Sequence, residues 1–465
     1  MRGFWRGFAG LAALLPVAAA AQERPDQTAF FALYKELVET NTVVNEGSCT
    51  RAAQQIGVRM KAAGYADNAI TLFSTPEHPN DGGIVVTLPG TDAKAGAMLL
   101  LGHLDVVAAK RADWVRDPFK LIEEDGFYYA RGTVDDKAMS AVWADAMVRF
   151  KQEGFRPRRT IKLALTCGEE TTYAFNGAEW LAKNRPELVR AEFVLNEGGG
   201  GRFAPDGKRQ ALAVQVGEKA AQNFTLLATN PGGHSSAPTP DNAIYELADA
   251  IKAVQGYEFP VKFTDTTRAF FTASAPAMPK PVGDAIGRLL ANPQDKEADA
   301  LVSRDKTLHS TLRTTCVATL VNAGHAENAL PQRATANVNC RIFPGESVDG
   351  TLAKLQELAG AKVKVTANQP VRPIAVPPPL DPKIMEPIKT LAAKHFPGTP
   401  LVPTMSTGAT DGVFFGTLKM PVYGVPGIFL ETDMNGIHGL NERIRVSSLY
   451  QGRDYLFDLA KALAG

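Results

Sequence analysis

Short apolar segments that alternate with helical stretches constrain the fold of the first half of the chain more than any other feature. These segments have the length of buried strands and occupy residues 83–88, 97–101, 161–166 and 193–196. Helical periodicity separates them, most clearly over 138–153 and 177–184. Strands that alternate with helices form a sheet covered on both faces, so an α/β domain is predicted here.

A different order of elements follows Gly217. Apart from a Pro- and Ala-rich region over 259–306, the order is strand, helix, strand, strand, helix, strand, predicted for 222–229, 241–254, 309–321, 333–343, 348–359 and 362–367. This β-α-β-β-α-β order is that of a ferredoxin-like unit. After a predicted linker over 370–382, helix 382–396 and strand 422–425 return to the α/β style.

The change of style and the later return predict a small domain inserted into a larger one. The expected boundaries are 25–217 for the first part of the larger domain, 218–368 for the inserted domain and 369–465 for the second part. Residues 25–465 are enough for two or three domains with a large buried core.

The first 21 residues (1–21) are predicted to be a secretory signal peptide. Arg2 and Arg6 precede an almost wholly apolar run over 8–20, which small and then polar residues follow. The run is short for a membrane span, and an uncleaved anchoring segment is the alternative. We therefore expect a secreted protein, in a bacterial periplasm or outside the cell. No other stretch approaches the roughly 20 apolar residues of a spanning helix, so no membrane partner is expected after signal removal.

Charge and cysteine content exclude two further classes. Fifty basic and 49 acidic residues leave a net charge of +1 without a basic block, so no nucleic-acid partner is expected. Four cysteines without a C-x-x-C pair exclude a cysteine zinc knuckle and are too few for a disulfide scaffold.

Acidic residues and a histidine follow the predicted strands and offer metal ligands. His103 and Asp105 come after strand 97–101 and lie two residues apart, so on extended backbone they face the same side. Asp135 and Asp136 follow a glycine turn and precede a helix, so capping of that helix is the alternative. A strand-end histidine without a metal is the alternative for His103.

Three more motifs complete the set. Glu169 and Glu170 follow strand 161–166, and both reach one site only if the strand has ended, as Gly168 allows. Glu197 ends the next strand, and His438 lies near the C-terminus. Two imidazoles and three carboxylates suit two borderline metal ions that share a carboxylate.

These motifs, in this order, resemble those of the co-catalytic zinc aminoacylases and carboxypeptidases. That family includes succinyl-diaminopimelate desuccinylase, glutamate carboxypeptidase, the carnosinase-type dipeptidases and carboxypeptidase S. The resemblance extends from about Phe30 to the C-terminus and implies a mixed central sheet with an inserted ferredoxin-like lid and dimerisation domain. It also implies two zinc ions per subunit, with Co²⁺ or Mn²⁺ left open as substitutes, held by His103, Asp135, Glu170, Glu197 and His438.

The resemblance implies roles for further residues. Glu169 is expected to be the general base and Asp105 the companion of His103, and a cis peptide bond is expected after Asp135. His234, in the segment 231–236, resembles a lid histidine that reaches the scissile carbonyl, often in the site of the partner subunit. A homodimer through the lid is therefore one expectation, although the long insertion at 259–306 leaves the oligomeric state open.

Substrate binding is expected from two regions of the chain. Asn328 and Arg341 lie in segments that resemble the family's substrate-binding segments, and Gly408 and Thr410 lie in a loop that resembles its carboxylate-holding loop. Arg341 also has chemical logic of its own, because a guanidinium fork grips a carboxylate in two places. A salt bridge within the lid is the alternative for this arginine.

The chain departs from the family pattern beside the glutamate pair. Gly168 stands where an acid is usual, and 171–173 replace small apolar and glycine residues, which leaves the shape of the pocket open. The segment 259–271 resembles the carboxypeptidase S branch in particular. That branch hydrolyses peptides and N-acyl amino acids with apolar parts, so we expect such substrates.

The expected reaction is metal-assisted hydrolysis that releases a C-terminal amino acid from peptides or N-acyl amino acids. Glu169 would take a proton from the attacking water, His234 would stabilise the oxyanion and Arg341 would hold the carboxylate. A zinc aminopeptidase or dipeptidase that recognises a free amine and a non-catalytic zinc-binding homologue remain as alternatives.

One cysteine pair is a candidate disulfide. In a hairpin of 309–321 and 333–343, Cys316 and Cys340 lie equally far from the centre at Asn328 and could face each other. Export would permit a disulfide, and two buried free thiols are the alternative.

Overall fold

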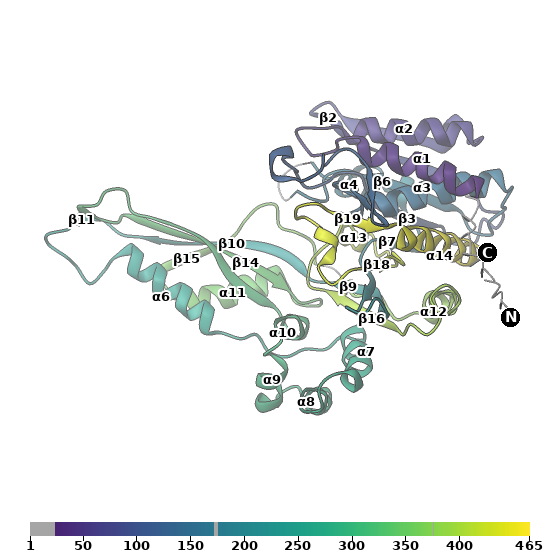
Figure 1. Ribbon diagram of the computed structural model, residues 1–465. Helices are drawn as coiled ribbons and strands as arrows, with labels where there is room; N and C mark the ends of the chain where they lie inside the picture. The colour runs from purple at the N-terminus through teal and green to yellow at the C-terminus, as the bar shows by residue number, and fades with distance from the viewer. Residues whose placement is uncertain (1–23, 172–174, 375) are drawn as a thin grey trace, which may run out of the picture.

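The computed structural model describes residues 24–171, 175–374 and 376–465. The predicted signal peptide, residues 1–21, lies outside the described residues. Figure 1 shows a large layered body, from which an arm built by the middle of the chain extends. Among the described residues, no helix combines the length and the apolar character needed to cross a membrane.

The large body contains a ten-stranded mixed sheet within the described ranges. Its strand order is β1-β2-β6-β3-β7-β17-β9-β8-β18, with β16 also paired to β9. The strands are β1 (Ile70–Thr75), β2 (His78–Leu88), β3 (Met98–His103), β6 (Ile161–Thr166), β7 (Phe193–Asn196), β8 (Gly199–Phe203), β9 (Arg209–Glu218), β16 (Leu401–Ser406), β17 (Val422–Gly424) and β18 (Phe429–Leu430). β6, β3 and β7 are parallel neighbours at its centre, so their carboxyl ends meet at one edge.

Helices cover both faces of this sheet, as the alternating pattern predicts. They are α1 (Pro25–Glu39), α2 (Cys49–Ala62), α3 (Lys137–Gln152), α4 (Gly177–Asn184), α5 (Pro186–Val189), α12 (Pro382–His395), α13 (Gly412–Gly416) and α14 (Val446–Ala464). Leu100 of β3 packs in the core with α1, α3 and α14, whereas Leu99 and Leu101 pack in the core with α4 and α13. The period of two along one strand therefore supplies apolar side chains to both faces.

The inserted unit has a four-stranded antiparallel sheet in the order β12-β14-β10-β15. Its elements are β10 (Ala220–Thr229), α6 (Ala243–Gly256), β12 (Thr315–Ala323), β14 (Arg333–Ile342), α11 (Val348–Ala359) and β15 (Val363–Ala367). The chain order and the sheet order are those of the predicted ferredoxin-like unit. Side chains of α6 and α11 pack with the sheet in a separate core.

The predicted strand at 309–321 is wrong in its first part. Residues Lys306–Leu312 form helix α10, and β12 begins only at Thr315. The Asp305 side chain accepts hydrogen bonds from the N–H groups of Thr307 and Leu308, so an N-cap starts a helix in a stretch whose composition favours a strand. The preceding region also holds α7 (Asp265–Ser274), α8 (Lys280–Ala291) and α9 (Lys296–Val302), which share a small core with α10.

Two small sheets complete the fold. β4 (Ile122–Glu124), β5 (Phe127–Tyr129) and β19 (Arg443–Arg445) join the two parts of the large body, far apart in sequence. β11 (Gly233–His234) pairs with β13 (Ala329–Leu330) at the far tip of the arm (Figure 1).

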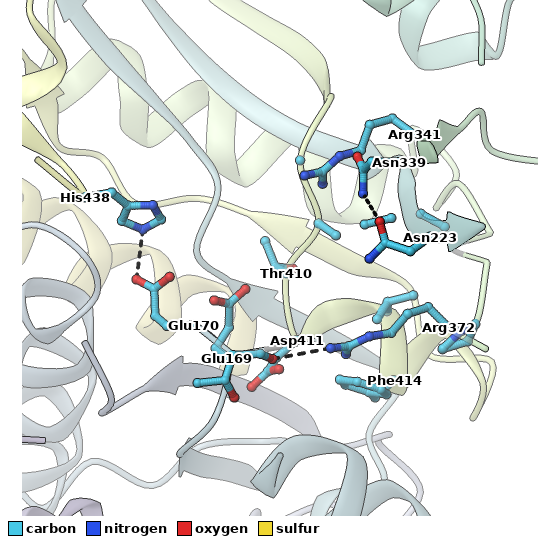
Figure 2. A pocket seen from close by; sticks show the side chains of 17 residues that line it. Glu169, Glu170, Asn223, Asn339, Arg341, Arg372, Thr410, Asp411, Phe414 and His438 are labelled. Atoms are coloured by element: carbon cyan, nitrogen blue, oxygen red, sulfur yellow. Dashed lines mark hydrogen bonds and ion pairs between the residues drawn. The ribbon is translucent and has the colours of Figure 1, made fainter. Parts of the chain in front are cut away.

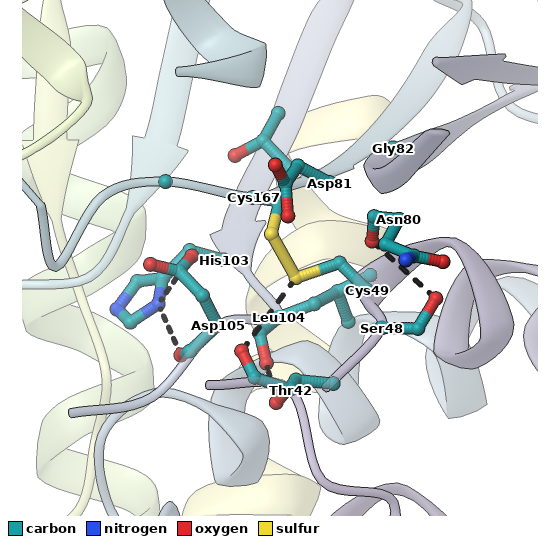
Figure 3. The surroundings of a disulfide bond; sticks show 12 residues. Thr42, Ser48, Cys49, Asn80, Asp81, Gly82, His103, Leu104, Asp105 and Cys167 are labelled. Atoms are coloured by element: carbon teal, nitrogen blue, oxygen red, sulfur yellow. Dashed lines mark hydrogen bonds and ion pairs between the residues drawn. A yellow bond between two sulfur atoms is a disulfide. The ribbon is translucent and has the colours of Figure 1, made fainter. Parts of the chain in front are cut away.

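Two disulfides link the four cysteines. Cys316 and Cys340 lie directly opposite each other on β12 and β14 and are bonded, which confirms the disulfide alternative. Cys49 and Cys167 form a second disulfide, which was not predicted because 118 residues separate them. This bond joins the start of α2 to the end of β6, beside Asp105 (Figure 3).

Candidate active site

The predicted metal ligands meet at the carboxyl edge of the central sheet. His103 ends β3, Glu170 follows β6 and Glu197 follows β7, and these three strands are neighbours. The turn before α3 adds Asp135, and the loop before β19 adds His438. Functional side chains gather at this edge because parallel strands point their carboxyl ends the same way.

Asp135 lies between the two histidines. Its Oδ1 is 3.2 Å from Nε2 of His103, and its Oδ2 is 3.0 Å from Nε2 of His438. Nε2 of His438 is also 2.9 Å from Oε1 of Glu170, and Nε2 of His103 is 3.7 Å from Oε1 of Glu197. One carboxylate that presents one oxygen to each imidazole is the arrangement expected of a bridging ligand.

The donor atoms fit borderline metal ions. Ligand atoms at the usual Zn–N and Zn–O lengths of about 2.0–2.2 Å in tetrahedral geometry lie roughly 3.3–3.6 Å apart. His103, Asp135 and Glu170 form one group with ligand atoms within 4.8 Å of one another, and His103, Glu169 and Glu197 form another. The two oxygens of Asp135 face different imidazoles, as a carboxylate shared by two ions would, and the second group places Glu169 beside the ligands.

The two neighbouring aspartates have different surroundings. The Asp135–Asp136 peptide bond is cis, as the resemblance implies. Oδ2 of the buried Asp136 accepts a hydrogen bond from the N–H of His103 at 3.2 Å, and burial raises the pKa of Asp136 to about 8. Neither carboxylate caps α3 through its side chain, so the capping alternative is not supported. Asp135 faces the histidines and Asp136 supports the backbone behind them.

Asp105 contacts His103, as Figure 3 shows, and also the backbone of the glutamate pair. Nδ1 of His103 is 3.0 Å from the carbonyl oxygen of Asp105 and 3.5 Å from its Oδ1. A proton on Nδ1 would leave the Nε2 lone pair to a bound metal ion. The Asp105 carboxylate also accepts hydrogen bonds from the N–H groups of Glu169 and Glu170, at 3.3 and 3.0 Å. One side chain therefore positions an imidazole and the glutamate pair.

Glu442 supports the turn that carries Asp135, a role that the sequence did not indicate although this residue lies in the His438 motif. Its Oε1 accepts from the N–H groups of Val134 and Asp135, at 2.8 and 3.2 Å. Its Oε2 accepts from the N–H of Gly132 at 3.0 Å and from Nη1 of Arg131 at 2.8 Å. The buried carboxylate thus satisfies four donors of one turn.

The electrostatics of the cluster favour bound cations. Burial raises the pKa of Glu169 and of Glu197 well above the usual range of a carboxyl group. Burial opposes ionisation of Asp135 too, but hydrogen bonds with His103 and His438 outweigh it and hold its pKa low. Hydrogen bonds with Asp135 and Glu170 raise the pKa of His438 to about 10. Buried carboxylates in such number need positive charge nearby.

A cavity of about 360 Å³ opens beside this cluster (Figure 2). Glu169, Glu170 and His438 line one side, and Arg341 lines the other. The guanidinium of Arg341 makes no hydrogen bond or ion pair with the part of the chain that the structure describes, and burial lowers its pKa. The salt-bridge alternative for Arg341 therefore has no partner among those residues.

The predicted substrate loop also lines the cavity. Gly408 and Thr410 both contribute to its wall. The N–H and Oγ1 of Thr410 each donate to Oε2 of Glu218 at 2.9 Å, and Nδ2 of Asn196 donates to Oγ1 of Thr410 at 3.1 Å. The loop is thereby tied to β9 and to β7, the strand that Glu197 follows.

The cavity with Arg341 is also lined by Asn223, Asn339 and Arg372, three polar residues that were not predicted from the sequence. Asn339 precedes Arg341 by two positions on β14 and pairs with Asn223 of β10, so strand periodicity was the available signal. Arg372 lies in the linker, where Nη2 donates to the carbonyl of Thr171 at 3.4 Å and the guanidinium lies over Phe414. No local pattern marked this residue.

His234 and Asn328 lie elsewhere. Both are exposed at the tip of the arm, and neither lines the cavity (Figure 1). The N–H of Ser236 donates to Nδ1 of His234 at 3.2 Å, so in the neutral ring the proton sits on Nε2. The site formed by the described residues of one chain therefore lacks these two side chains.

Comparisons with known proteins show the family to which the chain belongs. Residues 99–462 match the family model described as Peptidase family M20/M25/M40. An N-fatty-acyl-amino acid synthase/hydrolase of Homo sapiens is 29% identical over 432 residues, which cover 91% of this chain and 85% of that protein. A probable carboxypeptidase S-like protein of Dictyostelium discoideum is 27% identical over 400 residues, 81% of this chain and 74% of that protein.

Solved structures share the fold. An M20 family metallo-carboxypeptidase from Sulfolobus solfataricus superposes with a TM-score of 0.70 at 19% identity, covering 95% of this chain and 100% of that one. Human carnosine dipeptidase 1 superposes with a TM-score of 0.62 at 16% identity, covering 94% and 97%. The mixed sheet flanked by helices is common to these proteins. With its family match over residues 99–462, the chain belongs to Peptidase family M20/M25/M40 and is a hydrolase.

Proposed function

We propose that this protein is a dinuclear zinc hydrolase that releases a C-terminal amino acid from N-acyl amino acids or peptides. The observation that carries the proposal is the unpartnered guanidinium of Arg341, which faces the metal-ligand cluster across one cavity. A free carboxylate on Arg341 would place the neighbouring amide bond toward Glu169 and His438. The names of the human and Dictyostelium relatives support both substrate classes.

The proposed metal ligands fall into two sets that share Asp135. His103 and Glu197 would complete one set, and Glu170 and His438 the other, which is consistent with the paired distances. When bound, the pair of ions would supply Lewis acidity to the scissile carbonyl and would acidify the attacking water.

Glu169 is the proposed general base. Its carboxylate makes no hydrogen bond with another described side chain, and burial raises its pKa well above the usual range of a carboxyl group. A carboxylate of raised pKa beside the attacking water is suited to accept its proton. It would take a proton from water as the water oxygen attacks the acyl carbon. It would then deliver that proton to the amine nitrogen as the C–N bond breaks. Asp105 fixes the backbone from which Glu169 projects.

The cavity favours a carboxylate over a free amine. An aminopeptidase would need an acid on the wall opposite the ligands, whereas that wall holds Arg341 and Asn339, with Arg372 nearby. Burial lowers the pKa of the adjacent Lys219 to about 7, and the positive charge of Arg341 adds to this effect. At this wall an amine would meet the positive charge of Arg341, whereas a carboxylate would be attracted to it.

We also propose a homodimer in which the arm of one chain completes the site of the other. His234 and Asn328 are exposed on the arm and away from the cavity of their own chain, and Nε2–H of His234 is free to donate to a developing oxyanion. Edge strand β12 exposes Val317, Leu320 and Val321, which are 61%, 70% and 63% accessible. An exposed apolar edge strand is a surface that proteins usually cover.

Mixed dimers test this arrangement. Glu169→Gln and His234→Ala chains should each be nearly inactive alone. When they are mixed at equal amounts, some sites combine an intact Glu169 from one chain with an intact His234 from the other. The mixture should therefore regain about a quarter to a half of the wild-type activity. A matched mixture of Glu169→Gln with Glu170→Gln should regain no activity, because both residues belong to one chain's site and every site in that mixture lacks one of them. A monomer by light scattering, or no recovery from the first mixture, contradicts the dimer proposal.

Export is proposed on two grounds. The layout of residues 1–21 is that of a signal peptide, and both disulfides suit an oxidising compartment, secreted or periplasmic. N-terminal sequencing of the protein recovered from the periplasm and the medium would test this, with a start near residue 22 as the expected result.

A substrate panel tests the function itself. Purified, zinc-loaded protein would be given an N-acyl amino acid, a blocked dipeptide with a free C-terminus, the C-terminal amide of each and an aminoacyl anilide. The two free acids should be hydrolysed and their amides should not. Preference for the anilide would make the protein an aminopeptidase and would contradict the role of Arg341.

A further inference from the structure

A second cavity, of about 170 Å³, lies on the other side of the ligand cluster. Asp135 and Glu197 line it, whereas Glu169, Glu170 and His438 line the cavity that contains Arg341. The two cavities therefore approach the same cluster from different sides. If the amino-acid part of a substrate occupies the first cavity, its acyl part extends toward the second.

The walls of the second cavity are mainly apolar. They include Val134, Met139, Ile428, Leu430, Met434 and Ile437. The glycine run 198–200 forms another part of the wall. Gly200 has a φ of +93°, at which a side chain is strained. A Cβ added to Gly200 would also lie only 3.2 Å from the carbonyl oxygen of Ile428. The run keeps side chains out of the space, and the apolar lining suits hydrocarbon.

One charged side chain interrupts this lining. Arg202 of β8 pairs with Leu430 of β18 and lines the cavity. Its Nη1 is buried without a hydrogen-bond partner, and it forms no ion pair within the described residues. The nearby carboxylate of Glu431 is engaged by Arg445 at 2.7 Å.

Arg202 is half-buried, and a buried guanidinium nitrogen without a hydrogen-bond partner costs free energy. Burial also lowers the pKa of Arg202. A ligand that brings an anionic oxygen to Nη1 would remove this cost. The same logic applies to Arg341 in the first cavity, so one unpartnered arginine lies on each side of the cluster.

We infer that the second cavity binds the acyl part of the substrate and that Arg202 binds a carboxylate at the far end of the acyl chain. The inference rests on the proposed function and narrows its substrate class to N-acyl amino acids whose acyl group derives from an aliphatic dicarboxylic acid. Hydrolysis breaks the amide C–N bond, adds the hydroxyl of water to the acyl carbon and its proton to the amine nitrogen. The products are a dicarboxylic acid and a free amino acid.

Matched substrate pairs test this directly. Each pair carries the same amino acid and an acyl chain of the same length that ends either in a methyl group or in a carboxylate, in a series of increasing length. The wild-type kcat/KM should favour the carboxylate-ended member by about tenfold or more at the best length, the size expected for a charge-assisted pair.

Variants at Arg202 assign that preference to the side chain. Arg202→Met should lower kcat/KM for carboxylate-ended substrates by about 10- to 100-fold and leave methyl-ended substrates within about twofold, and Arg202→Lys should fall between. Lys208→Gln is the charge-matched control, since Lys208 lies in the turn after β8 with its side chain 83% accessible. It should match wild type. Thermal unfolding of each variant checks that the fold is intact.

Binding gives a readout independent of turnover. Calorimetry with free dicarboxylic acids should detect binding to wild type and a loss of about tenfold or more in affinity for Arg202→Met, with monocarboxylic acids of equal length unaffected. Efficient hydrolysis of methyl-ended substrates with no dependence on Arg202 would overturn the inference and leave the proposed function standing. Failure to hydrolyse any N-acyl amino acid would overturn both.

Discussion

Replacing Glu442 by Gln should destabilise the protein far more than an ordinary loss of one charge. The Glu442 carboxylate pairs with Arg131, and their side chains are only 1% and 3% accessible. It also accepts hydrogen bonds from three backbone N–H groups of the turn that ends at Asp135. In the amide, one of the two oxygens becomes an NH₂ group, so two of the four donors lose their acceptor and face another donor.

The expected magnitude follows from burial. Removing one partner of a buried ion pair costs about 3–5 kcal/mol because the other charge stays buried and unpaired. Typical stabilities are about 5–15 kcal/mol, so the variant would lose a fifth or more of its stability. Glu431→Gln is the matched control. Glu431 pairs with Arg445 nearer to solvent, and their side chains are 19% and 37% accessible, respectively. Ion pairs exposed to solvent contribute only about 0–1 kcal/mol to stability.

Urea unfolding of metal-free protein measures this effect without a contribution from bound ions. Zinc titration of the folded variants then measures the second consequence, since the turn positions Asp135. The Glu442→Gln variant should show a lower unfolding midpoint and weaker zinc binding, and Glu431→Gln should show neither. If both variants unfold within about 1 kcal/mol of wild type, Glu442 does not hold the turn as described.

Further predictions concern the base, the disulfides and the loop at Thr410. Glu169→Gln should keep its zinc and lose about 100- to 10,000-fold in kcat, and near-normal turnover would exclude it as the base. Replacing both cysteines of Cys49–Cys167 by serine should lower the free energy of unfolding by about 5 kcal/mol, because this bond closes a loop of 118 residues. The same change at Cys316–Cys340, which closes a loop of 24 residues, should lower it by about 3.5 kcal/mol. The reverse order in denaturant unfolding would contradict this ranking. Burial raises the pKa of Glu218 to about 8, so the native state binds its proton more tightly than the unfolded chain, and stability falls as pH rises from about 4.5 to about 8. The free energy of unfolding of Glu218→Gln should therefore rise relative to that of wild type as pH rises across this window, by roughly 5 kcal/mol at pH 8. If the difference between the two proteins does not change with pH, Glu218 is ionised in the folded protein throughout the window.

Local patterns predicted much of the large body. Strand 161–166, strand 193–196 and helix 177–184 have the observed bounds, and so does helix 348–359 of the inserted unit. The strands are short apolar runs, and each helix has a helical period and an N-cap residue before it. The ligands could be predicted for the same reason. Each follows a strand or a glycine turn, and parallel strands bring such ends together.

Contacts between distant parts of the chain could not be predicted in this way. Glu442 meets Val134 across 308 residues, and Cys49 meets Cys167 across 118. The hydrophobic periodicity of one segment gives no information about which distant segment it will contact. Helices α7, α8 and α9 were also missed, since their small separate core forms only when α10 joins them. Arg202 lies in a short strand whose partner is 228 positions away at Leu430, so its surroundings depend wholly on the fold.

The most direct test of the central claim is a cycle of two substrates and two enzymes. The kcat/KM values of an N-acyl amino acid and of its C-terminal amide would be measured for wild type and for Arg341→Gln, with Arg333→Gln, an exposed arginine on the same strand, as the control. Wild type and control should prefer the free acid by about 10- to 100-fold or more, and Arg341→Gln should reduce that preference to nearly one. An unchanged preference in Arg341→Gln would contradict carboxylate recognition by Arg341 and with it the proposed orientation of the substrate.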